Sequence, residues 1–359
     1  MLKLYDRILI FNSAFPGDIV LTTPLVRAVY EHFPGASLAF CTTPAGARLL
    51  GGLSYLDALI IYDKHGRDRG VRGMLRTAWK LRKEHFELVF SVHRSLRTAI
   101  LLSLAGIPQR VGFKESAGER LYSLRVPRAD WLHETERNLS LLEPFGVDIS
   151  QLSKQPVLPV TAEEANHVFG QLGLGPPQGS GPLVIVAPGS VWGTKMWLAE
   201  RFAELIDLLA GVFSARVIMV GNALDRPQAD SVLSACKSLV VDLVGMTDLR
   251  ELCALLRKAD LVVTGDSAPM HIAWAFDVPT VAIFGATTPE LGFAPLSQLC
   301  RVVEVRGLEC RPCSAHGPRY CRLGHFRCMR DITVDMVLEA CKDLLQAGRT
   351  ESEPGSKRA

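Results

Sequence analysis

The chain lacks any run of apolar residues long enough to cross a membrane. Its longest apolar candidates, such as residues 99–107, have the length of a core strand or a buried helix, well short of the ~18 residues of a spanning segment. The first residues lead straight into a predicted strand and carry no apolar signal core. These absences predict a cytoplasmic protein.

The chain also lacks a strong net charge and a disulfide pattern. The formal charge is +3 over 359 residues, which is too weak for the usual footprint of a nucleic-acid-binding protein. Nine cysteines is an odd number and argues against a disulfide framework in a reducing compartment. The charge is uneven: residues 1–150 hold 20 Lys and Arg against 15 Asp and Glu, and residues 151–359 hold 20 against 22. The first part therefore favours an anionic partner, although random surface variation explains the difference equally well.

What the sequence does contain is two successive series of alternating strands and helices. Short apolar runs such as residues 7–11 and 183–187 alternate with helical patterns such as residues 18–32, 70–83 and 249–258. This alternation predicts an α/β protein with parallel sheets. A stretch rich in Pro and Gly separates the two series. We expect domains at residues 1–175 and 176–347, and a disordered tail at 348–359.

The loop after the first predicted strand contains Gly17 and Asp18. Loops at the carboxyl ends of parallel strands form the ligand sites of such sheets. A carboxylate there is suited to general-base catalysis, and the alternative is that Asp18 only caps the helix that follows. His93, Arg94 and Arg97, near the end of a later strand, are suited to meet an anionic substrate.

The loop after the first strand of the second series contains Ser190 and Lys195. Small residues and one lysine suit a phosphate group, although an ordinary strand–helix loop is an equal alternative. The loop does not match a P-loop, and no G-x-G-x-x-G follows a strand, which disfavours an NAD site.

A third loop, residues 264–271, joins an apolar strand to a helix. Asp266 or Ser267 can cap this helix, and the free N–H groups of its first turn make an anion site. His271 lies one turn into the helix; a lone histidine there is more often structural than catalytic.

Two further features leave alternatives open. Four cysteines with zinc-like spacing either hold a structural metal or form a compact reduced loop; they are Cys310, Cys313, Cys321 and Cys328. The helical segment 70–83 is basic, and Val71, Met74, Leu75 and Ala78 form its apolar face. Its cationic face is either merely solvated or rests on anionic lipid headgroups.

Together these motifs resemble glycosyltransferase family 9, the lipopolysaccharide heptosyltransferases, over about residues 7–345. The resemblance rests on Gly17-Asp18 with Thr23-Pro24, on Pro188-Gly189-Ser190 with Lys195, and on residues 266–273 with 285–289. The cysteine pattern that ends in Cys328-Met329 resembles the heptosyltransferase II branch. The resemblance implies a GT-B fold, in which two Rossmann-like domains face a cleft, and inverting transfer without a catalytic metal or other cofactor.

By this resemblance, the first domain binds the acceptor and the second binds the nucleotide-sugar, typically ADP-heptose. Asp18 would be the general base, and Arg94 and Arg97 would meet the anionic inner-core acceptor. The donor site would comprise Ser190, Lys195, Met246, Asp266, Ser267, Ala268 and His271. Ala268 replaces a family glycine, which leaves the donor identity open.

The resemblance also implies peripheral contact with the cytoplasmic face of the inner membrane and no nucleic-acid partner. The alternatives are a transferase for another nucleotide-sugar and acceptor, a sugar-nucleotide epimerase, and a non-enzymic module that binds a nucleotide or a metal.

Overall fold

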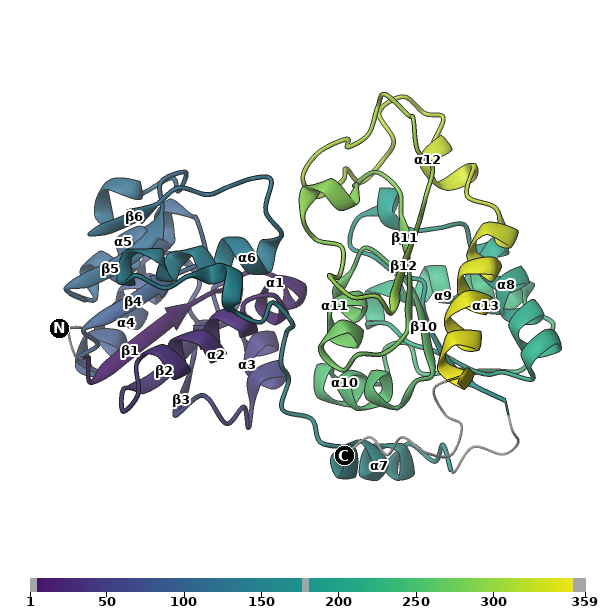
Figure 1. The fold of residues 1–359 in the computed structure, drawn as a ribbon, viewed down its shortest axis with the longest axis horizontal. Helices are drawn as coiled ribbons and strands as arrows, with labels where there is room; N and C mark the ends of the chain where they lie inside the picture. The colour runs from purple at the N-terminus through teal and green to yellow at the C-terminus, as the bar shows by residue number, and fades with distance from the viewer. Residues whose placement is uncertain (1–4, 176–180, 351–359) are drawn as a thin grey trace. The chain divides into compact units, whose positions relative to one another are not determined.

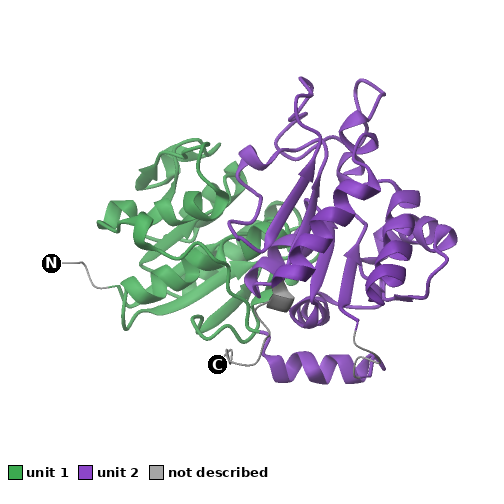
Figure 2. Ribbon diagram, turned by 45° about the vertical axis from the view of Figure 1, so that its right-hand side comes forward, with its two compact units in different colours: residues 1–159 green, residues 160–359 purple. Residues whose placement is uncertain are grey.

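The computed structural model of the protein describes residues 5–175 and 181–350. The chain divides into two compact units, residues 1–159 and 160–359 (Figure 2). The sequence predicted a division between residues 175 and 176, but helix α7 (Ala162–Gln171) belongs to the second unit. Helix α7 packs against α10 (Leu249–Lys258), and Arg250 of α10 donates to Glu164 at 2.7 Å.

The first unit is a six-stranded parallel sheet in the order β3-β2-β1-β4-β5-β6 (Figure 1). Its strands are β1 (Arg7–Phe11), β2 (Ser37–Thr42), β3 (Ala58–Ile61), β4 (Leu88–Ser91), β5 (Gln109–Phe113) and β6 (Leu124–Val126). Its helices are α1 (Pro16–Val20), α2 (Thr23–His32), α3 (Pro44–Leu50), α4 (Gly70–Lys83), α5 (Leu96–Leu104) and α6 (Glu134–Leu139). Short 3₁₀ helices lie at η1 (Glu119–Leu121), η2 (Ser140–Phe145) and η3 (Ile149–Gln151).

The second unit has a parallel sheet in the order β12-β11-β10-β7-β8-β9. Its strands are β7 (Leu183–Ala187), β8 (Arg216–Met219), β9 (Val240–Asp242), β10 (Leu261–Gly265), β11 (Thr280–Phe284) and β12 (Cys300–Glu304). Besides α7 and α10, its helices are α8 (Ala199–Phe213), α9 (Arg226–Ala235), α11 (Ala268–Ala275), α12 (Arg327–Arg330) and α13 (Val334–Thr350). The 3₁₀ helices are η4 (Gly193–Lys195), η5 (Ala223–Asp225) and η6 (Pro289–Leu291).

Both sheets have the strand order 3-2-1-4-5-6 when each is numbered from its own first strand. The predicted α/β class with two parallel sheets is confirmed. Residues of β7 and β10 are buried throughout, as expected for strands covered on both faces by helices. The order reverses between β1 and β4 in the first unit and between β7 and β10 in the second, so the loops after these four strands flank the two switch points where such folds bind ligands.

Several predicted elements differ in detail. The helix expected over residues 18–32 is two helices, α1 and α2, because Pro24 stands in the first turn of α2 and a proline has no N–H to continue the helix before it. Strands β6 and β12 and helix α6 were not predicted. Residues 348–350 belong to α13, and the rest of the expected disordered tail, 351–359, lies outside the described residues.

The face that α4 buries was predicted only in part, since Met74 and Ala78 are buried as expected. Val71 and Leu75 are exposed, whereas the buried residues are Gly73, Met74, Thr77, Ala78 and Leu81. Gly73 fixes this rotation, since a Cβ there would come within 2.1 Å of the backbone carbonyl of Asp68. Within the described ranges, no helix is long and apolar enough to span a bilayer.

Candidate functional site

Asp18 lies in the loop–helix junction that follows β1, at the switch point of the first sheet. Its Oδ2 accepts the backbone N–H of Phe15 at 3.2 Å, as part of a capping box. Lys64 is an electrostatic neighbour of this carboxylate. The capping role that the sequence suggested is therefore present, and it fixes the orientation of a half-buried carboxylate.

A buried asparagine holds this junction in place. Asn12 follows β1, and its Nδ2 donates to Thr22 Oγ1 at 2.8 Å. Thr22 Oγ1 in turn donates to the backbone carbonyl of Asp18 at 2.7 Å. These three groups all come from the β1–α2 segment, so part of the order of the loop around Asp18 is local in the sequence.

The loop after β4 brings His93 and Arg94 to the other side of the same switch point. His93 Nδ1 lies 2.8 Å from Thr98 Oγ1. Burial, together with Lys64 and Arg94, lowers the pKa of His93 to about 4, so this ring is neutral at pH 7. Arg94 is exposed, and its electrostatic neighbours include Arg128, Glu134 and Arg137.

Arg97 was predicted to meet the acceptor, but its donors are directed elsewhere. Its Nε donates to the Tyr62 hydroxyl at 2.6 Å, and its Nη2 donates to the carbonyl of Gly70 at 2.7 Å and to that of Asp68 at 3.2 Å. These bonds fasten the start of α4 to α5. In this structure, Arg97 positions the loop before α4, and an acceptor role for it stays a prediction.

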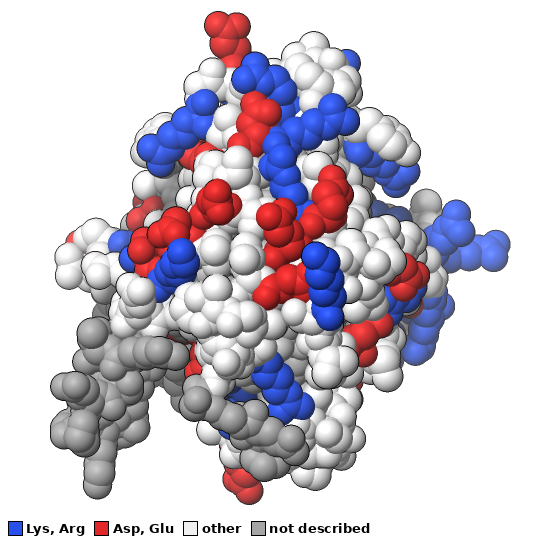
Figure 3. Space-filling view, turned by 90° about the vertical axis from the view of Figure 1, so that its right-hand side faces the viewer, with Lys and Arg blue, Asp and Glu red and all other residues white. Residues whose placement is uncertain are grey.

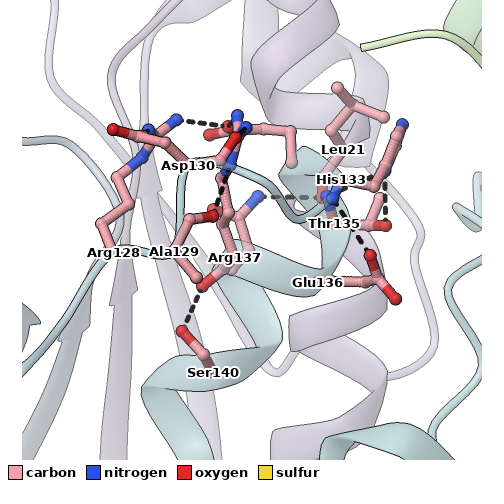
Figure 4. Close-up of polar contacts among 11 residues, drawn as sticks. Leu21, Arg128, Ala129, Asp130, His133, Thr135, Glu136, Arg137 and Ser140 are labelled. Atoms are coloured by element: carbon pink, nitrogen blue, oxygen red, sulfur yellow. Dashed lines mark hydrogen bonds and ion pairs between the residues drawn. The ribbon is translucent and has the colours of Figure 1, made fainter. Parts of the chain in front are cut away.

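The neighbours of Arg94 form a buried cluster that the sequence analysis missed (Figure 4). Glu134 Oε2 accepts from Arg128 Nη2 at 2.8 Å and from Arg137 Nη1 at 3.0 Å. Only 3% of the Arg137 side chain is exposed. Asn138, from the same helix, donates to the carbonyl of Leu21 at 3.0 Å. The cluster therefore links the surroundings of Arg94 to the end of α1, the helix that carries Asp18.

In the second unit, the loops after β7 and β10 meet at a buried ion pair. Lys195 Nζ donates to Asp266 Oδ2 at 2.6 Å, and their side chains are 11% and 7% exposed. The hydroxyl of Thr287, from the loop after β11, donates to the same oxygen at 2.8 Å. One carboxylate thus holds a lysine at the switch point, where that lysine has further N–H donors for an anionic ligand.

Helix α11 begins beside this ion pair. Ser267 occupies its N-cap position without a side-chain capping bond, and its hydroxyl lies 3.1 Å from Thr264 Oγ1. Pro269 has no N–H, and the N–H of Met270 donates to the carbonyl of Ser267 at 3.1 Å. The N–H of Ala268 and the positive end of the helix dipole can therefore meet an anion.

His271 lies one turn into α11 and is buried. Burial lowers its pKa to about 4, against the attraction of Asp266 and with a contribution from Lys195. Its Nδ1 has no hydrogen-bond partner among the residues the structure describes. The ring is therefore a neutral, buried group close to the Lys195–Asp266 ion pair.

Ser190 and Met246 follow different strands, β7 and β9, at the carboxyl edge of the same sheet. Ser190 Oγ accepts the N–H of Trp192 at 3.2 Å, which shapes the loop after β7. Met246 lies in the turn after β9 and is 66% exposed. Since β9 is two strands away from β7, no described contact joins Met246 to the Lys195 ion pair.

The cysteine loop supports this region through an arginine that the sequence analysis missed. Arg311 is 4% exposed and donates to the carbonyls of Gly285 and Thr287, at 2.5 and 2.8 Å, and to Glu304 Oε2 at 3.0 Å. The amide of Cys313 donates to the carbonyl of Ala286 at 2.8 Å. The loop therefore fixes the end of β11 that positions Thr287.

The thiols themselves do not converge as metal ligands. Across residues 5–175 and 181–350, no three His, Cys, Asp or Glu side chains are grouped to hold a metal ion. Cys310 Sγ lies 3.9 Å from His325 Nε2. Burial and the neighbouring thiols raise the pKa of Cys328 to about 11, so this side chain is a protonated core residue.

Comparison with known proteins places these features in a family. The profile of glycosyltransferase family 9 (heptosyltransferase) matches residues 74–322. Lipopolysaccharide heptosyltransferase 2 of Escherichia coli is 27% identical over 83% of this chain and 88% of its own length. Lipooligosaccharide heptosyltransferase 2 of Haemophilus influenzae is 28% identical over 94% and 99%.

Solved structures share the fold. A glycosyl transferase family 9 structure from Veillonella parvula superimposes with a TM-score of 0.85 and 21% identity, covering 97% of this chain and 99% of the other. The E. coli ADP-heptose lps heptosyltransferase II gives a TM-score of 0.79 with 22% identity over 96% and 99%. The predicted GT-B class is confirmed by this likeness.

Proposed function

Because the chain belongs to glycosyltransferase family 9, we propose that it transfers a heptose from ADP-heptose to the inner core of lipopolysaccharide. Its curated relatives are named as heptosyltransferases of lipopolysaccharide or lipooligosaccharide. The observation that carries the proposal is the Lys195–Asp266–Thr287 cluster beside the N-terminus of α11. A cation and a helix N-terminus at a switch point suit a nucleoside diphosphate.

On the donor side, the second unit stabilises the leaving group. When the bond between the anomeric carbon and the diphosphate breaks, negative charge develops on the departing ADP. Lys195 and the N-terminal end of α11, with the N–H of Ala268, supply fixed positive charge for it, and Asp266 prevents the lysine from moving away. Ser190, Ser267 and Ala268 line this donor site. Met246 contacts the nucleotide from the turn after β9. His271, buried in α11, supports the loop that carries Asp266 and Ser267.

On the acceptor side, Asp18 is the general base of an inverting displacement. It takes the proton of the acceptor hydroxyl as the hydroxyl oxygen attacks the anomeric carbon, and ADP departs from the opposite face. The capping bond from Phe15 leaves a carboxylate of fixed orientation. Arg94, with Arg128 nearby, is the group we assign to the anionic acceptor.

The acceptor is anchored in a membrane, and we propose that the enzyme works at the cytoplasmic face of the inner membrane as a peripheral protein. Exposed cationic and apolar side chains of the first unit support this placement.

Asp18→Asn tests the proposal. The change keeps the shape of the side chain and removes the base, so turnover should fall by ~10²-fold or more, while ADP binding should stay unchanged. A labelled nucleotide-sugar assay with inner-core acceptors measures transfer and distinguishes it from epimerisation of the donor.

The matched control is Asp148→Asn. Asp148 also caps a short helical turn in the first unit, by accepting the N–H of Ser150 at 3.0 Å, but it lies away from the switch point. Turnover in this control should stay near the wild-type value. Near-normal turnover in Asp18→Asn would refute the assignment of the base.

A further inference from the structure

Helix α4 exposes apolar side chains that no element of the first unit covers. Val71, Leu75 and Trp79 are 67%, 47% and 58% exposed. They are spaced four residues apart, so they form one stripe along the outer side of the helix. Three exposed large apolar side chains in one stripe differ from the scattered single residues of an ordinary surface.

This stripe lies within a strongly cationic segment. Residues 64–83 hold eight Lys and Arg against one acidic residue, Asp68. Asp68 is buried and paired with Arg76 at 2.7 Å. Lys83 Nζ lies 3.5 Å from the centroid of the Trp79 ring, which holds a cation directly beside the exposed indole.

A groove of about 660 Å³ adjoins the stripe, between α4 and the edge strand β3. Leu59, Ile60 and Ile61 line it from β3, and Trp79, Lys80 and Lys83 line it from α4. Three acids also line the groove, and all are engaged. Asp63 accepts the N–H groups of Gly66 and Arg67, Asp68 pairs with Arg76, and Glu84 pairs with Arg7 at 2.7 Å. The groove therefore offers an apolar wall and lysine ammonium groups to a ligand.

The second unit has a different pattern of surface charge. On the face of the second unit in Figure 3, acidic and basic side chains are interspersed. Among the described residues of the second unit, acidic and basic side chains also pair with each other, for example Arg226 with Asp230 and Lys342 with Glu339. Such a face is typical of a solvated surface, and α4 is not of this kind.

We propose that the outer face of α4 and the adjoining groove dock on a bilayer rich in anionic phospholipid, with one headgroup phosphate bound by Lys80 and Lys83. This inference rests on the proposed function for its purpose, since it names the surface through which the enzyme approaches a membrane-bound acceptor. Trp79 and the aliphatic side chains enter the interfacial region. The arginines and lysines are attracted to the negative surface potential of the leaflet.

Charge favours this occupant over a second copy of the chain. A symmetric dimer through α4 would bring two cationic faces together, with like charges opposed. An anionic lipid surface satisfies the cations and the apolar stripe at once.

Vesicle co-sedimentation of the full chain tests the proposal. The protein should bind phosphatidylglycerol-rich vesicles and not pure phosphatidylcholine vesicles, and binding should fall as salt screens the charges. Two variants address the two halves of the surface: Val71→Ser/Leu75→Ser/Trp79→Ser, and Arg72→Gln/Lys80→Gln/Lys83→Gln. Each should lower the partition coefficient about tenfold or more.

The matched control is Leu224→Ser/Leu239→Ser, which removes two side chains of the second unit that are 87% and 98% exposed. It should bind vesicles as the wild type does. Equal binding to both kinds of vesicle, or wild-type binding by both α4 variants, would overturn the proposal. So would a concentration-dependent dimer in sedimentation that the triple serine variant abolishes.

Transfer assays separate this proposal from the enzymatic one. Both α4 variants should transfer heptose to a deacylated, water-soluble acceptor at the wild-type rate, and should be slowed with the same acceptor embedded in vesicles. If the wild type transfers heptose to neither acceptor, the proposed function fails, and the vesicle measurements still decide the docking surface.

Discussion

Replacing Asp266 by asparagine should destabilise the second unit by about 3 kcal/mol. The carboxylate is 2.6 Å from Lys195 Nζ, and both side chains are nearly buried. Breaking a buried ion pair costs about 3–5 kcal/mol because the remaining charge is left uncompensated. The asparagine oxygen can still accept from Lys195 and Thr287, which places the loss at the low end of that range.

The assay is a double-mutant cycle measured by urea unfolding. Fluorescence of the buried Trp197 and Trp274 reports on the second unit. Lys195→Met and Asp266→Asn should each be destabilising, and the double variant should lose less than their sum by about 2 kcal/mol, since it removes both charges.

The more exposed pair Arg226–Asp242, whose side chains are 34% and 30% exposed, is the control for this cycle. Its coupling energy should be below about 1 kcal/mol. Losses for Lys195 and Asp266 that add within about 0.5 kcal/mol would refute the reasoning that Asp266 holds the lysine.

Two further predictions follow from the same unit. Lys195→Met should raise the Kd for ADP about tenfold or more in calorimetry. The control Lys258→Met, at an exposed lysine bonded to Asn166, should leave this Kd unchanged. If Lys195→Met binds ADP as tightly as the wild type does, a phosphate contact for Lys195 is excluded. The pKa of His271 is lowered from 6.5 to about 4, so the unfolded state binds more protons between these values, and stability is lost as pH falls from 6.5 toward 4. His271→Gln should reduce the slope of unfolding free energy against pH in this window by up to about 1.4 kcal/mol per unit; an unchanged slope would show that His271 takes up its proton without unfolding.

Local patterns were sufficient to predict most of the fold. Helix α4 and strand β7, for example, have the bounds that their apolar spacing and flanking residues predicted. The switch-point rule also identified the loops that carry Lys195 and Asp266, because loops after the first and fourth strands of such a sheet must be neighbours. The switch-point rule gives no distances between side chains. The ion pair between Lys195 and Asp266 could therefore be seen only in the structure.

The remaining features depend on contacts that leave no periodic signal. The rotation of α4 is set by the approach of Gly73 to the backbone of Asp68, and no hydrophobic pattern records such an approach. Glu134 and Arg311 were missed because charged residues are usually solvated. Their burial becomes explicable only when their partners, two arginines for Glu134 and several carbonyl groups for Arg311, are brought together by the fold.

The charge asymmetry of the chain acquires a different meaning once the structure is known. From the sequence alone, the positive excess of residues 1–150 favours an anionic partner such as the acceptor. Residues 64–83 alone hold eight of its 20 Lys and Arg and one of its 15 acidic residues, so the remainder holds 12 against 14. The excess therefore lies entirely on α4 and the loop before it. Acceptor binding at Arg94 must accordingly rest on a few oriented guanidinium groups. The diffuse cationic surface is confined to α4 and the loop before it, and such a surface suits a membrane better than a single substrate.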